Sequence, residues 1–579
     1  MAQGIWAAVL LGVVWFHPGA AQDAPPPEAP SGRVDRAAAV AERFMIVTAN
    51  PLASDAGAAA LARGGSAVDA MVAAQLMLNL VEPQSSGIGG GAFLLYWDAK
   101  ARKLTTFDAR ETAPQAADPD LFMKPDGTPM SFDEAVTGGR SVGVPGTLAV
   151  LELAHRLHGR LPWADLVQPA ADLAEKGFEV SPRLAAAIAD AGAKVTRFVA
   201  TGAYLLGTDG APRQQGSMLR NPELAQTLRA IAAEGSAPFY RGKIGDAIVA
   251  AVRGAPVNPG TMTPADLASY RVVLREPVCR PYRAVQVCGM GPPSSGGVAV
   301  LQILGLLEHF DMAQLGPTAD GFQALLEASK LAFADRNLYL ADTDFVRVPL
   351  RGLLDHSYLT TRAQQIRLDT SLDKAIAGNP PWREAGPLAP DESLKLPGTS
   401  QLVIVDRDGN ALSMTTTIES GFGSGLMVGG FMLNNELTDF SFLPQDGGRP
   451  VANRVEGGKR PRSSMAPTIV FDGEGSPVLL IGSPGGSQII GYVAQALVGV
   501  LDWGMTPQQA VAAGHVLSRN GPAELEAGTE AANLEPALVA RGQKPQLKSL
   551  NSGLHAIRIA PGRLESGIDP RREGAARGG

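Results

Sequence analysis

The chain has 579 residues, of which 45% are hydrophobic and 18% charged, and its mean hydropathy is +0.04. These values exclude a disordered or fibrous chain and predict a large globular core. The net charge of −7 and the lack of a long basic run argue against nucleic-acid binding. Glycine is abundant, because 67 of the 579 residues, about 12%, are glycine against a usual level of about 7%. Because no G-X-Y period accompanies it, this excess indicates tight turns and closely approached backbone rather than collagen.

The N-terminus carries an apolar stretch, Ile5 to Phe16, which is too short to span a bilayer and is typical of a signal peptide. Small residues follow at Gly19, Ala20 and Ala21. We therefore expect a signal peptide over residues 1–21 and an exported protein, periplasmic or secreted. An uncleaved anchor is the alternative, because the first four residues lack a basic side chain. No other stretch reaches 18 apolar residues, so we expect no stable membrane span in the mature chain.

Apolar spacing predicts the elements of the first half of the chain. Ala53 to Leu80 is rich in alanine with helical periodicity interrupted by a glycine pair, which predicts two helices packed through small residues. Gly87 to Asp98 leads from a glycine loop into a strand, and residues 105–111 predict a second strand. Helical spacing returns between Val142 and Ser181.

A polar, proline-rich segment, Gly378 to Ser400, predicts an exposed loop or a domain boundary. Strand signals follow it: Gln401 to Asp406 and Ala411 to Ile418 flank an Asp-Gly turn and predict a hairpin. Residues 478–491 predict a strand, a Gly-Gly corner and a helix. Backbone N–H groups at such a corner are suited to stabilising an oxyanion.

The remaining signals concern cysteine, histidine and the C-terminus. Cys279 and Cys288 flank a short turn between strand-like segments, and either a local disulfide or two buried thiols fits this spacing. The histidines show no ligand spacing beyond His155 and His158, which fit a helix surface, so we expect no metal and no cofactor. The segment from Arg571 to Arg577 predicts a frayed tail.

An ordered series of motifs, covering nearly the whole chain after residue 45, resembles the gamma-glutamyltransferase (gamma-glutamyltranspeptidase) family of N-terminal-nucleophile hydrolases. The motifs are VEPQSSGIGGGAF (81–93), FDARETAP (107–114), GVPGT (143–147), PPSSGG (292–297), ADRNLYLADTDFVRVP (334–349), TSQLVIVDRDGNA (399–411), FMLNNELTDFS (431–441), KRPRSSMAPT (459–468) and GSPGGS (482–487). The resemblance implies an α+β fold, a four-layer αββα sandwich of two stacked antiparallel sheets. It also implies a precursor that cuts itself between Gly398 and Thr399. The large subunit (22–398) and the small subunit (399–579) would then remain associated as a heterodimer.

In this family the cut makes one residue both nucleophile and base. Thr399 would supply its hydroxyl and a new α-amino group, whose pKa near 8 suits a general base in a chain without a Ser-His-Asp constellation. By the same resemblance, Thr417 orients the nucleophile, and Gly485 and Gly486 supply the oxyanion-hole amides. The residues implied to bind the substrate are Arg110, Ser463 and Ser464 for its α-carboxylate and Glu436 and Asp439 for its α-ammonium.

The resemblance implies hydrolysis of the γ-glutamyl amide of glutathione and related compounds through a threonyl ester, with transfer to water, amino acids or peptides. One departure bears on this activity. Glu419 stands where the best-known transferases carry an asparagine at the α-amino end of the substrate, and it adds a third carboxylate beside Glu436 and Asp439. This predicts either a protonated carboxyl group or a preference for a more cationic or differently shaped acyl group.

Two further features bear on the activity that the resemblance implies. Ser400 and Gln401 replace the small residue and histidine that usually follow the nucleophile, and the glycine-rich segment 440–462 is a candidate lid over the pocket.

One alternative function is a glutaryl or cephalosporin-type acylase of the same family. The other is a non-catalytic exported paralogue that acts as a binding module.

Overall fold

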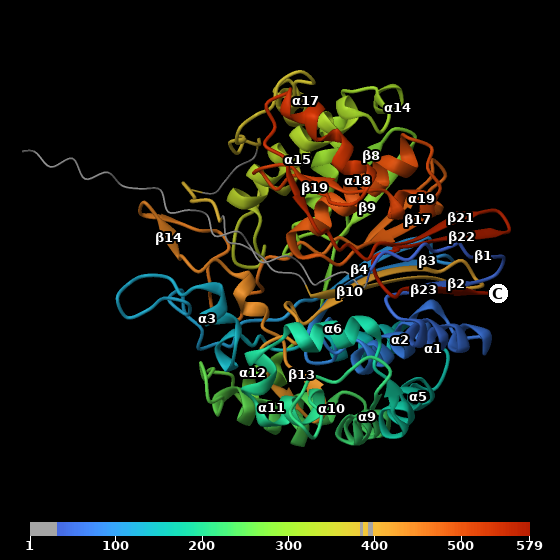
Figure 1. Cartoon of the computed structure of the whole chain (residues 1–579), viewed down its shortest axis with the longest axis vertical. Coiled ribbons are helices and arrows are strands. Elements are labelled where there is room, and N and C mark those ends of the chain that lie inside the picture. The colour runs from blue at the N-terminus through green and yellow to red at the C-terminus, as the bar shows by residue number, and fades with distance from the viewer. Residues whose placement is uncertain (1–31, 382–385, 392–397) are drawn as a thin grey trace, which may run out of the picture.

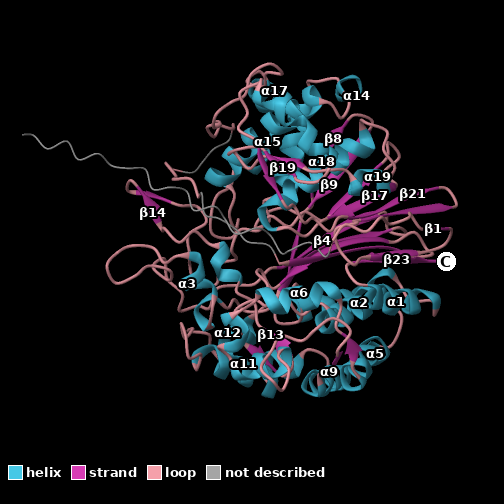
Figure 2. Cartoon of the chain, in the orientation of Figure 1, coloured by secondary structure: helices cyan, strands magenta, loops and turns pink. Residues whose placement is uncertain are grey.

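Two seven-stranded antiparallel sheets lie face to face in the middle of the molecule, and helices cover the outer face of each (Figure 1, Figure 2). The computed structural model describes residues 32–381, 386–391 and 398–579. These four layers are those of the αββα sandwich that the family resemblance implies. The expected signal peptide and parts of the proline-rich segment before Thr399 lie outside the described residues.

Helices on the outer side of the first sheet confirm both helical predictions for the first half of the chain. They are α1 (Pro51–Ala62), α2 (Ala67–Val81), α4 (Thr147–His158) and α5 (Trp163–Lys176). The boundary before α2 has a physical cause. Ser66 caps the helix by accepting from the backbone N–H of Asp69, whose carboxylate accepts in return from the Ser66 N–H at 2.8 Å.

The first sheet contains the predicted hairpin. Its strand order is β23 (Ala575–Gly578), β2 (Met45–Thr48), β10 (Thr399–Val405), β11 (Ala411–Thr417), β3 (Gly91–Asp98), β4 (Lys103–Ala109) and β7 (Val273–Arg275). Along β10, Leu402 and Ile404 pack into the core under α1 and α2, whereas Val403 and Val405 pack into the core shared with the second sheet. Because both faces of β10 are buried, its sequence is continuously apolar rather than alternating. The strand begins at Thr399, two residues earlier than expected.

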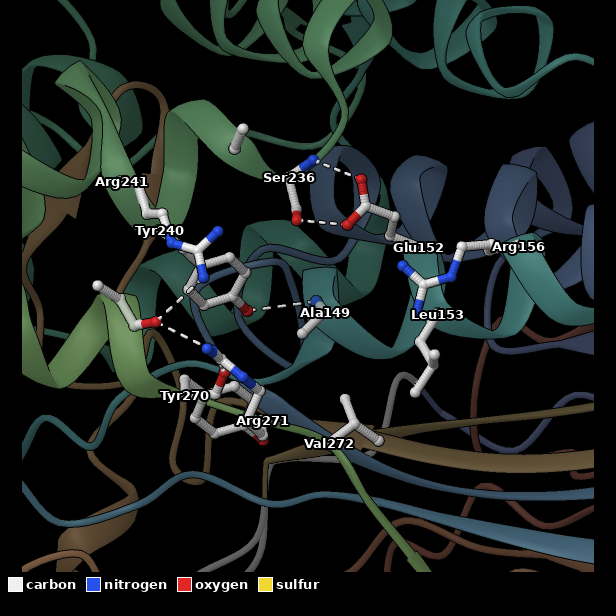
Figure 3. Close-up of a pocket in the computed structure, with 12 residues that line it drawn as sticks. Ala149, Glu152, Leu153, Arg156, Ser236, Tyr240, Arg241, Tyr270, Arg271 and Val272 are labelled. Carbon is white, nitrogen blue, oxygen red and sulfur yellow. Dashed lines mark hydrogen bonds between the residues drawn. The ribbon is translucent and has the colours of Figure 1, made fainter.

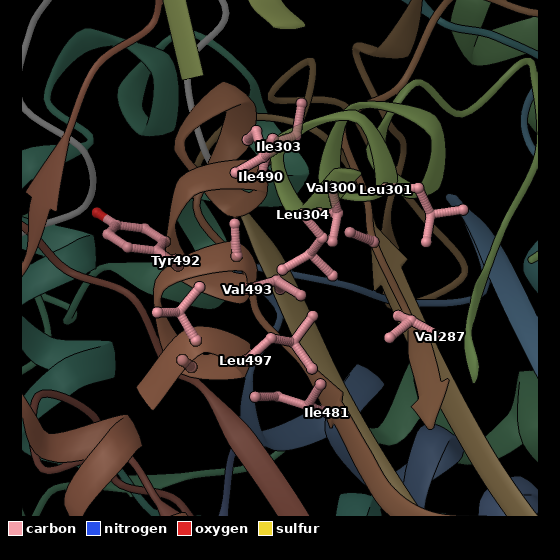
Figure 4. Packing of buried hydrophobic residues seen from close by; sticks show 14 of the residues in the cluster. Val287, Val300, Leu301, Ile303, Leu304, Ile481, Ile490, Tyr492, Val493 and Leu497 are labelled. Carbon is pink, nitrogen blue, oxygen red and sulfur yellow. The ribbon is translucent and has the colours of Figure 1, made fainter. Parts of the chain in front are cut away.

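The second sheet packs between the first sheet and a separate helical layer. Its order is β1 (Val40–Ala41), β22 (Arg563–Ile568), β21 (His555–Ala560), β17 (Pro477–Gly482), β16 (Thr468–Phe471), β9 (Val285–Gly289) and β8 (Val278–Tyr282). The covering helices include α13 (Gly296–Leu307), α15 (Ala319–Tyr339) and α18 (Ile489–Leu501). Figure 4 shows apolar side chains of α13 and α18 meeting over Ile481 and Val287 of this sheet. Cys279 and Cys288 are paired across β8 and β9 and form a disulfide, which resolves the alternative that the sequence leaves open.

The other elements are shorter or lie outside these layers. The remaining helices are α3 (Phe132–Val136), α6 (Pro182–Asp190), α7 (Ala193–Thr196), α8 (Val199–Leu205), α9 (Pro222–Glu234), α10 (Ala237–Arg241), α11 (Lys243–Arg253), α12 (Pro264–Ser269), α14 (Met312–Leu315), α16 (Leu350–Leu353), α17 (His356–Ala363), α19 (Pro507–Ala512) and α20 (Glu535–Val539). The remaining strands are β5 (Phe178–Glu179), β6 (Met218–Leu219), β12 (Met427–Val428), β13 (Phe431–Met432), β14 (Gln445–Asp446), β15 (Arg449–Pro450), β18 (Val516–Leu517), β19 (Glu524–Glu526) and β20 (Gln546–Lys548). Within the described residues, no helix has both the length and the hydropathy required to cross a bilayer.

The C-terminus corrects one expectation. Instead of fraying, Ala575–Gly578 forms β23 and pairs antiparallel with β2. Arg571 is buried and donates to the carboxylates of Glu526 and Asp569. Glu526 lies 45 residues from Arg571 and is brought to it by the fold, whereas Asp569, two residues before Arg571, is a local partner that the expectation of a frayed tail overlooked.

Both sheets are built from strands on either side of Gly398. In the first sheet, β10, β11 and β23 follow that residue, and β2, β3, β4 and β7 precede it. In the second sheet, β1, β8 and β9 precede it, and the other four strands follow. A chain cut after Gly398 would therefore hold its two parts together through ladder hydrogen bonds and both cores.

Candidate active site

Thr399 begins β10 directly opposite Thr417, the last residue of β11, so the hairpin register places the two hydroxyl groups together. Their oxygens are 3.4 Å apart. Thr417 Oγ1 donates to the carbonyl oxygen of Gly398 at 2.6 Å and accepts from the backbone N–H of Glu419 at 2.8 Å. Because a hydroxyl carries one proton, the Thr417 oxygen is left to accept the proton of Thr399. One side chain thus contacts both the candidate nucleophile and the carbonyl group that precedes it.

Arg572 fixes the main chain of the candidate nucleophile from the other side. Its Nη1 donates to the carbonyl oxygen of Thr399 at 3.1 Å, and its side chain is buried. The sequence analysis missed this residue because it lies in the segment expected to fray. No local pattern reveals its acceptor, because Thr399 lies 173 residues away in the chain.

The Gly485-Gly486 corner lies between β17 and α18, as the sequence predicts. Gly485 has φ of 131° and Gly486 has φ of 57°, values that side chains with a Cβ rarely adopt. A Cβ on Gly485 would lie 2.7 Å from the ring of Tyr492, so the corner also excludes larger residues by packing. Gly486 lines the same pocket as Thr399. The main-chain turn at Gly485 and Gly486 therefore lies at the pocket that contains the candidate nucleophile.

The glycine loop before β3 lies against the end of β11. A Cβ on Gly90 would overlap the carbonyl oxygen of Thr417, and one on Gly89 would overlap that of Met432. This close approach explains why the stretch from Gly87 to Gly91 is nearly all glycine. It confirms the expectation that part of the glycine excess serves backbone contact with neighbouring strands.

Arg110 follows β4 and lies fully buried between the carboxylates of Glu436 and Asp439, forming an ion pair with each. Both acids come from a single 3₁₀ turn, Glu436–Asp439. Residues three apart in such a turn lie one above the other, so both carboxylates face the guanidinium group. The Nε of Arg110 donates to the carbonyl oxygen of Pro461 at 3.1 Å, which fixes the plane of the group.

Four buried carboxyl groups lie in this cluster, and Arg110 forms ion pairs with three of them, those of Glu111, Glu436 and Asp439. Burial, followed by the charges of Asp439 and Glu436, raises the pKa of Glu419 well above its ordinary value. Burial raises the pKa of Glu436 to about 7, against the opposing effect of Arg110. Burial and the charge of Glu436 also raise the pKa of Glu111. Burial and mutual repulsion therefore favour the protonated forms of these carboxyl groups, which is the direction of the first alternative predicted for Glu419.

The raised pKa values give the uncut, substrate-free chain a specific pH dependence. Glu436 binds a proton more tightly in the folded chain than in the unfolded chain, where its pKa is 4.5. Its contribution to the free energy of unfolding is therefore fully present below pH 4.5 and is lost as the pH rises through about 7. We expect the melting temperature of Glu436→Gln to fall less between pH 5.5 and 8 than that of the parent chain. Thermal unfolding of both chains across this range checks it, and parallel curves would contradict it.

The loop that carries Glu419 is held by a lysine that the sequence analysis missed. Glu419 has φ of 76°, which is uncommon for a residue with a side chain. Lys194 Nζ donates to Ser420 Oγ at 3.0 Å, to Gly421 O at 3.0 Å and to Gly423 O at 2.8 Å. Asn435 Nδ2 donates to Glu419 Oε2 at 2.7 Å. The loop and the carboxylate are therefore fixed by donors from two distant segments.

Ser463 and Ser464 lie beside the cluster. The carbonyl oxygen of Ser463 accepts from Ser295 N at 2.8 Å, which joins this segment to the PPSSGG motif. Ser464 Oγ accepts from Arg336 Nη2 at 2.7 Å, and Arg336 Nε donates to Ser295 Oγ at 2.9 Å. Because Arg336 occupies an acceptor position of Ser464, the hydroxyl proton of Ser464 is left for another acceptor. Arg336 and Ser295 come from motifs that carry the family resemblance, although the sequence analysis assigned them no role.

A single narrow pocket, of about 20 Å³, is lined by nine of the ten predicted site residues. They are Arg110, Thr399, Thr417, Glu419, Glu436, Asp439, Ser463, Ser464 and Gly486. Gly485 immediately precedes Gly486 at its edge, and the lining also contains Met465, Ser487 and Ile489. No lining residue comes from the candidate lid, within which Gln445–Asp446 and Arg449–Pro450 form the β14 and β15 hairpin with an exposed tip.

Known proteins resemble the chain in both sequence and structure. The family model described as Gamma-glutamyltranspeptidase matches residues 53–579. A glutathione hydrolase proenzyme of Bacillus subtilis (strain 168) is 42% identical over 476 residues, covering 81% of this chain and 79% of that protein. A second glutathione hydrolase proenzyme, from Escherichia coli (strain K12), is 37% identical over 545 residues and covers 92% of this chain and 91% of that protein.

Among solved structures, the cephalosporin acylase from Bacillus halodurans superposes with a TM-score of 0.82 at 28% identity, covering 98% of this chain and 99% of that chain. The structural match therefore extends over nearly the whole chain and not only over the individual motifs. The chain belongs to the gamma-glutamyltranspeptidase family.

Proposed function

We infer that the chain is an autoprocessed glutathione hydrolase and gamma-glutamyltransferase that uses Thr399 as its nucleophile. The observation that carries this function is the position of Thr417, whose hydroxyl bonds the carbonyl of Gly398 and lies 3.4 Å from the hydroxyl of Thr399. A non-catalytic binding module would not require this arrangement. The glutathione hydrolase proenzymes among the relatives support the same activity.

Maturation follows from the same contacts. The Thr399 oxygen attacks the Gly398 carbonyl carbon, and the hydrogen bond from Thr417 polarises that carbonyl. The peptide C–N bond breaks, the nitrogen takes the hydroxyl proton, and an ester joins Gly398 to the Thr399 oxygen. Water then hydrolyses the ester and releases the Gly398 carboxylate. The products are the proposed subunits, 22–398 and 399–579, which the interleaved strands hold together as a heterodimer.

The freed Thr399 then acts on substrate. Its α-amino group, with a pKa near 8, takes the hydroxyl proton while the oxygen attacks the γ-carbonyl of the donor. Gly486 lines the pocket beside Thr399, and we propose that the backbone N–H groups of Gly485 and Gly486 stabilise the oxyanion as it develops. The amine leaves with a proton, and a γ-glutamyl ester remains on Thr399. Water completes hydrolysis, or an amino acid or peptide amine completes transfer.

Substrate recognition exchanges ion pairs within the pocket. In the substrate-free chain, Arg110 is paired with Glu436 and Asp439. The α-carboxylate of a γ-glutamyl donor accepts two hydrogen bonds from the guanidinium group of Arg110 and one from a hydroxyl of Ser463 or Ser464. The carboxylates of Glu436 and Asp439 are then free to bind the α-ammonium group. The ammonium group of the donor thus replaces Arg110 as the cation beside Glu436 and Asp439.

The charge balance also distinguishes this donor from a glutaryl compound, which has no ammonium group. We expect a γ-glutamyl anilide to be hydrolysed with kcat/KM at least about tenfold above that of the matching glutaryl anilide, because a charge-assisted bond contributes roughly 1.5–3 kcal/mol. Parallel assays of the two compounds, with the same leaving group, measure this ratio. A preference for the glutaryl compound would instead identify an acylase, the function named for the Bacillus halodurans structure.

Export and maturation share one experiment. We propose that the protein is exported through the signal peptide 1–21, which the apolar stretch supports, and the disulfide of the mature chain is compatible with an oxidising compartment. A denaturing gel should show two fragments, with N-termini QDAPP and TSQLV, that elute together under native conditions. A single uncut band would overturn the enzymatic function, and an N-terminus within residues 1–21 would overturn cleavage after Ala21.

A further inference from the structure

A second cavity, of about 480 Å³, lies among the helices outside the first sheet, between α4, α10 and the segment Ala268 to Val272 (Figure 3). Its volume falls within the roughly 300–1,000 Å³ of typical small-molecule sites. None of the ten predicted active-site residues lines it. The proposed function therefore gives this cavity no role.

Two tyrosine rings form a fixed apolar surface in the cavity. Tyr240 and Tyr270 stack with ring centroids 6.0 Å apart and planes 10° from parallel. Each ring is held at its hydroxyl end: Tyr240 donates to Pro145 O at 2.9 Å, and Tyr270 donates to Arg110 O at 2.8 Å. Leu153 and Val272 add aliphatic surface. Because the hydroxyl groups are already bonded within the protein, the rings are preorganised for a ligand with an apolar body.

Three exposed arginines give the cavity its charge. Arg241 and Arg271 both donate to a single carbonyl oxygen, that of Ala268, at 3.5 and 2.9 Å. Figure 3 shows Arg241 and Arg271 on the same side of the cavity. Arg156 lies across the cavity from them. Throughout the residues that the structure describes, none of the three forms an ion pair with a carboxylate.

The one carboxylate in the lining is already engaged. Glu152 Oε1 accepts from Ser236 N at 2.9 Å, and Oε2 accepts from Ser236 Oγ at 2.5 Å. Glu152 therefore serves the start of α10 rather than the arginines. The cavity carries an excess of positive charge beside an apolar surface.

We propose that this cavity binds a small organic anion, a carboxylate or sulfonate attached to an aromatic or branched apolar body. The anionic group lies between Arg241 and Arg271, where guanidinium donors match its oxygens and where the two like charges otherwise face only neutral carbonyl oxygens, those of Ala268 and Tyr270. The body packs against Leu153, Val272 and the tyrosine rings. A zwitterionic amino acid is a poor ligand, because the only carboxylate available to its ammonium is already bonded to Ser236.

Two dyes that differ in charge provide the test. Anilinonaphthalene sulfonate has the proposed anionic head and apolar body, and N-phenylnaphthylamine has the same body without the charge. On the Thr399→Ala chain, fluorescence titration should give saturable sulfonate binding at one site. The double variant Arg241→Ala/Arg271→Ala should weaken that binding by at least about tenfold, since each charge-assisted bond is worth roughly 1.5–3 kcal/mol. Its affinity for the neutral dye should stay the same.

The controls separate this site from general dye adsorption and from the active site. Arg253→Ala removes an exposed arginine from α11 that does not line the cavity, and it should leave sulfonate binding unchanged. Circular dichroism verifies that each variant is folded. If the double variant is not folded, Arg271→Lys, which preserves the charge, is used in its place. Equal sulfonate affinity in the parent and the folded double variant would overturn the proposal. Because the titration uses an inactive chain, its result is independent of the proposed catalytic function.

Discussion

The Thr399→Ala chain is expected to remain a single polypeptide and to lose at least about 10³-fold of its hydrolytic rate, because the nucleophile and the later base are both derived from Thr399. The backbone of β10 should persist, since its ladder bonds to β2 and β11 do not involve the hydroxyl. A denaturing gel and release of the anilide product measure the two losses.

The matched control is Thr399→Ser, which keeps an oxygen at the same position and should still cut itself. Cleavage of the alanine chain before residue 399 would contradict the assignment of the nucleophile. An uncleaved serine chain would indicate that the threonine methyl group is needed to hold the oxygen near Thr417, which lies 3.4 Å away.

Arg110→Lys is expected to raise KM for a γ-glutamyl donor by about 100-fold with a smaller effect on kcat. Lysine keeps the charge but loses the planar fork that holds an α-carboxylate with two hydrogen bonds, a loss of roughly 3 kcal/mol. The lysine ammonium also cannot span Glu436 and Asp439 as Arg110 does. Steady-state kinetics of the cleaved enzyme provides both parameters.

Arg280→Lys is the corresponding control for this substitution. Arg280 lies in β8 and pairs with Glu308 at 2.6 Å, away from the pocket lining. Its replacement should leave KM unchanged. A normal KM for Arg110→Lys, together with efficient self-cleavage, would mean that the α-carboxylate is held elsewhere.

Local patterns in the sequence were sufficient for the elements that present the site. The Asp-Gly turn and its two apolar runs predicted the hairpin of β10 and β11, and the Gly-Gly corner predicted the end of β17. The hairpin and the corner both depend on the conformational preferences of residues that are adjacent in the sequence. The order of strands within the sheets was not predictable from such patterns, because β2 and β23 pair across more than 500 residues.

The partners that fix the site side chains were missed for a related reason. Lys194, Arg336 and Arg572 donate to residues more than 100 positions away in the chain. A basic residue in isolation usually predicts a solvated surface. Their burial is explained only by the acceptors that the fold brings to them, and the expected frayed tail was wrong for the same reason.

The position of β23 has a consequence for the order in which the molecule becomes active. Ribosomes make a chain from its N-terminus, so Arg572 is synthesised 173 residues after Thr399 and the strand Ala575–Gly578 follows it. Yet Arg572 bonds the carbonyl of Thr399, and β23 pairs with β2, the neighbour of β10. A chain terminated before Arg572 lacks both contacts. The complete geometry around Thr399 therefore forms only after the segment from Arg572 to Gly578 has been synthesised.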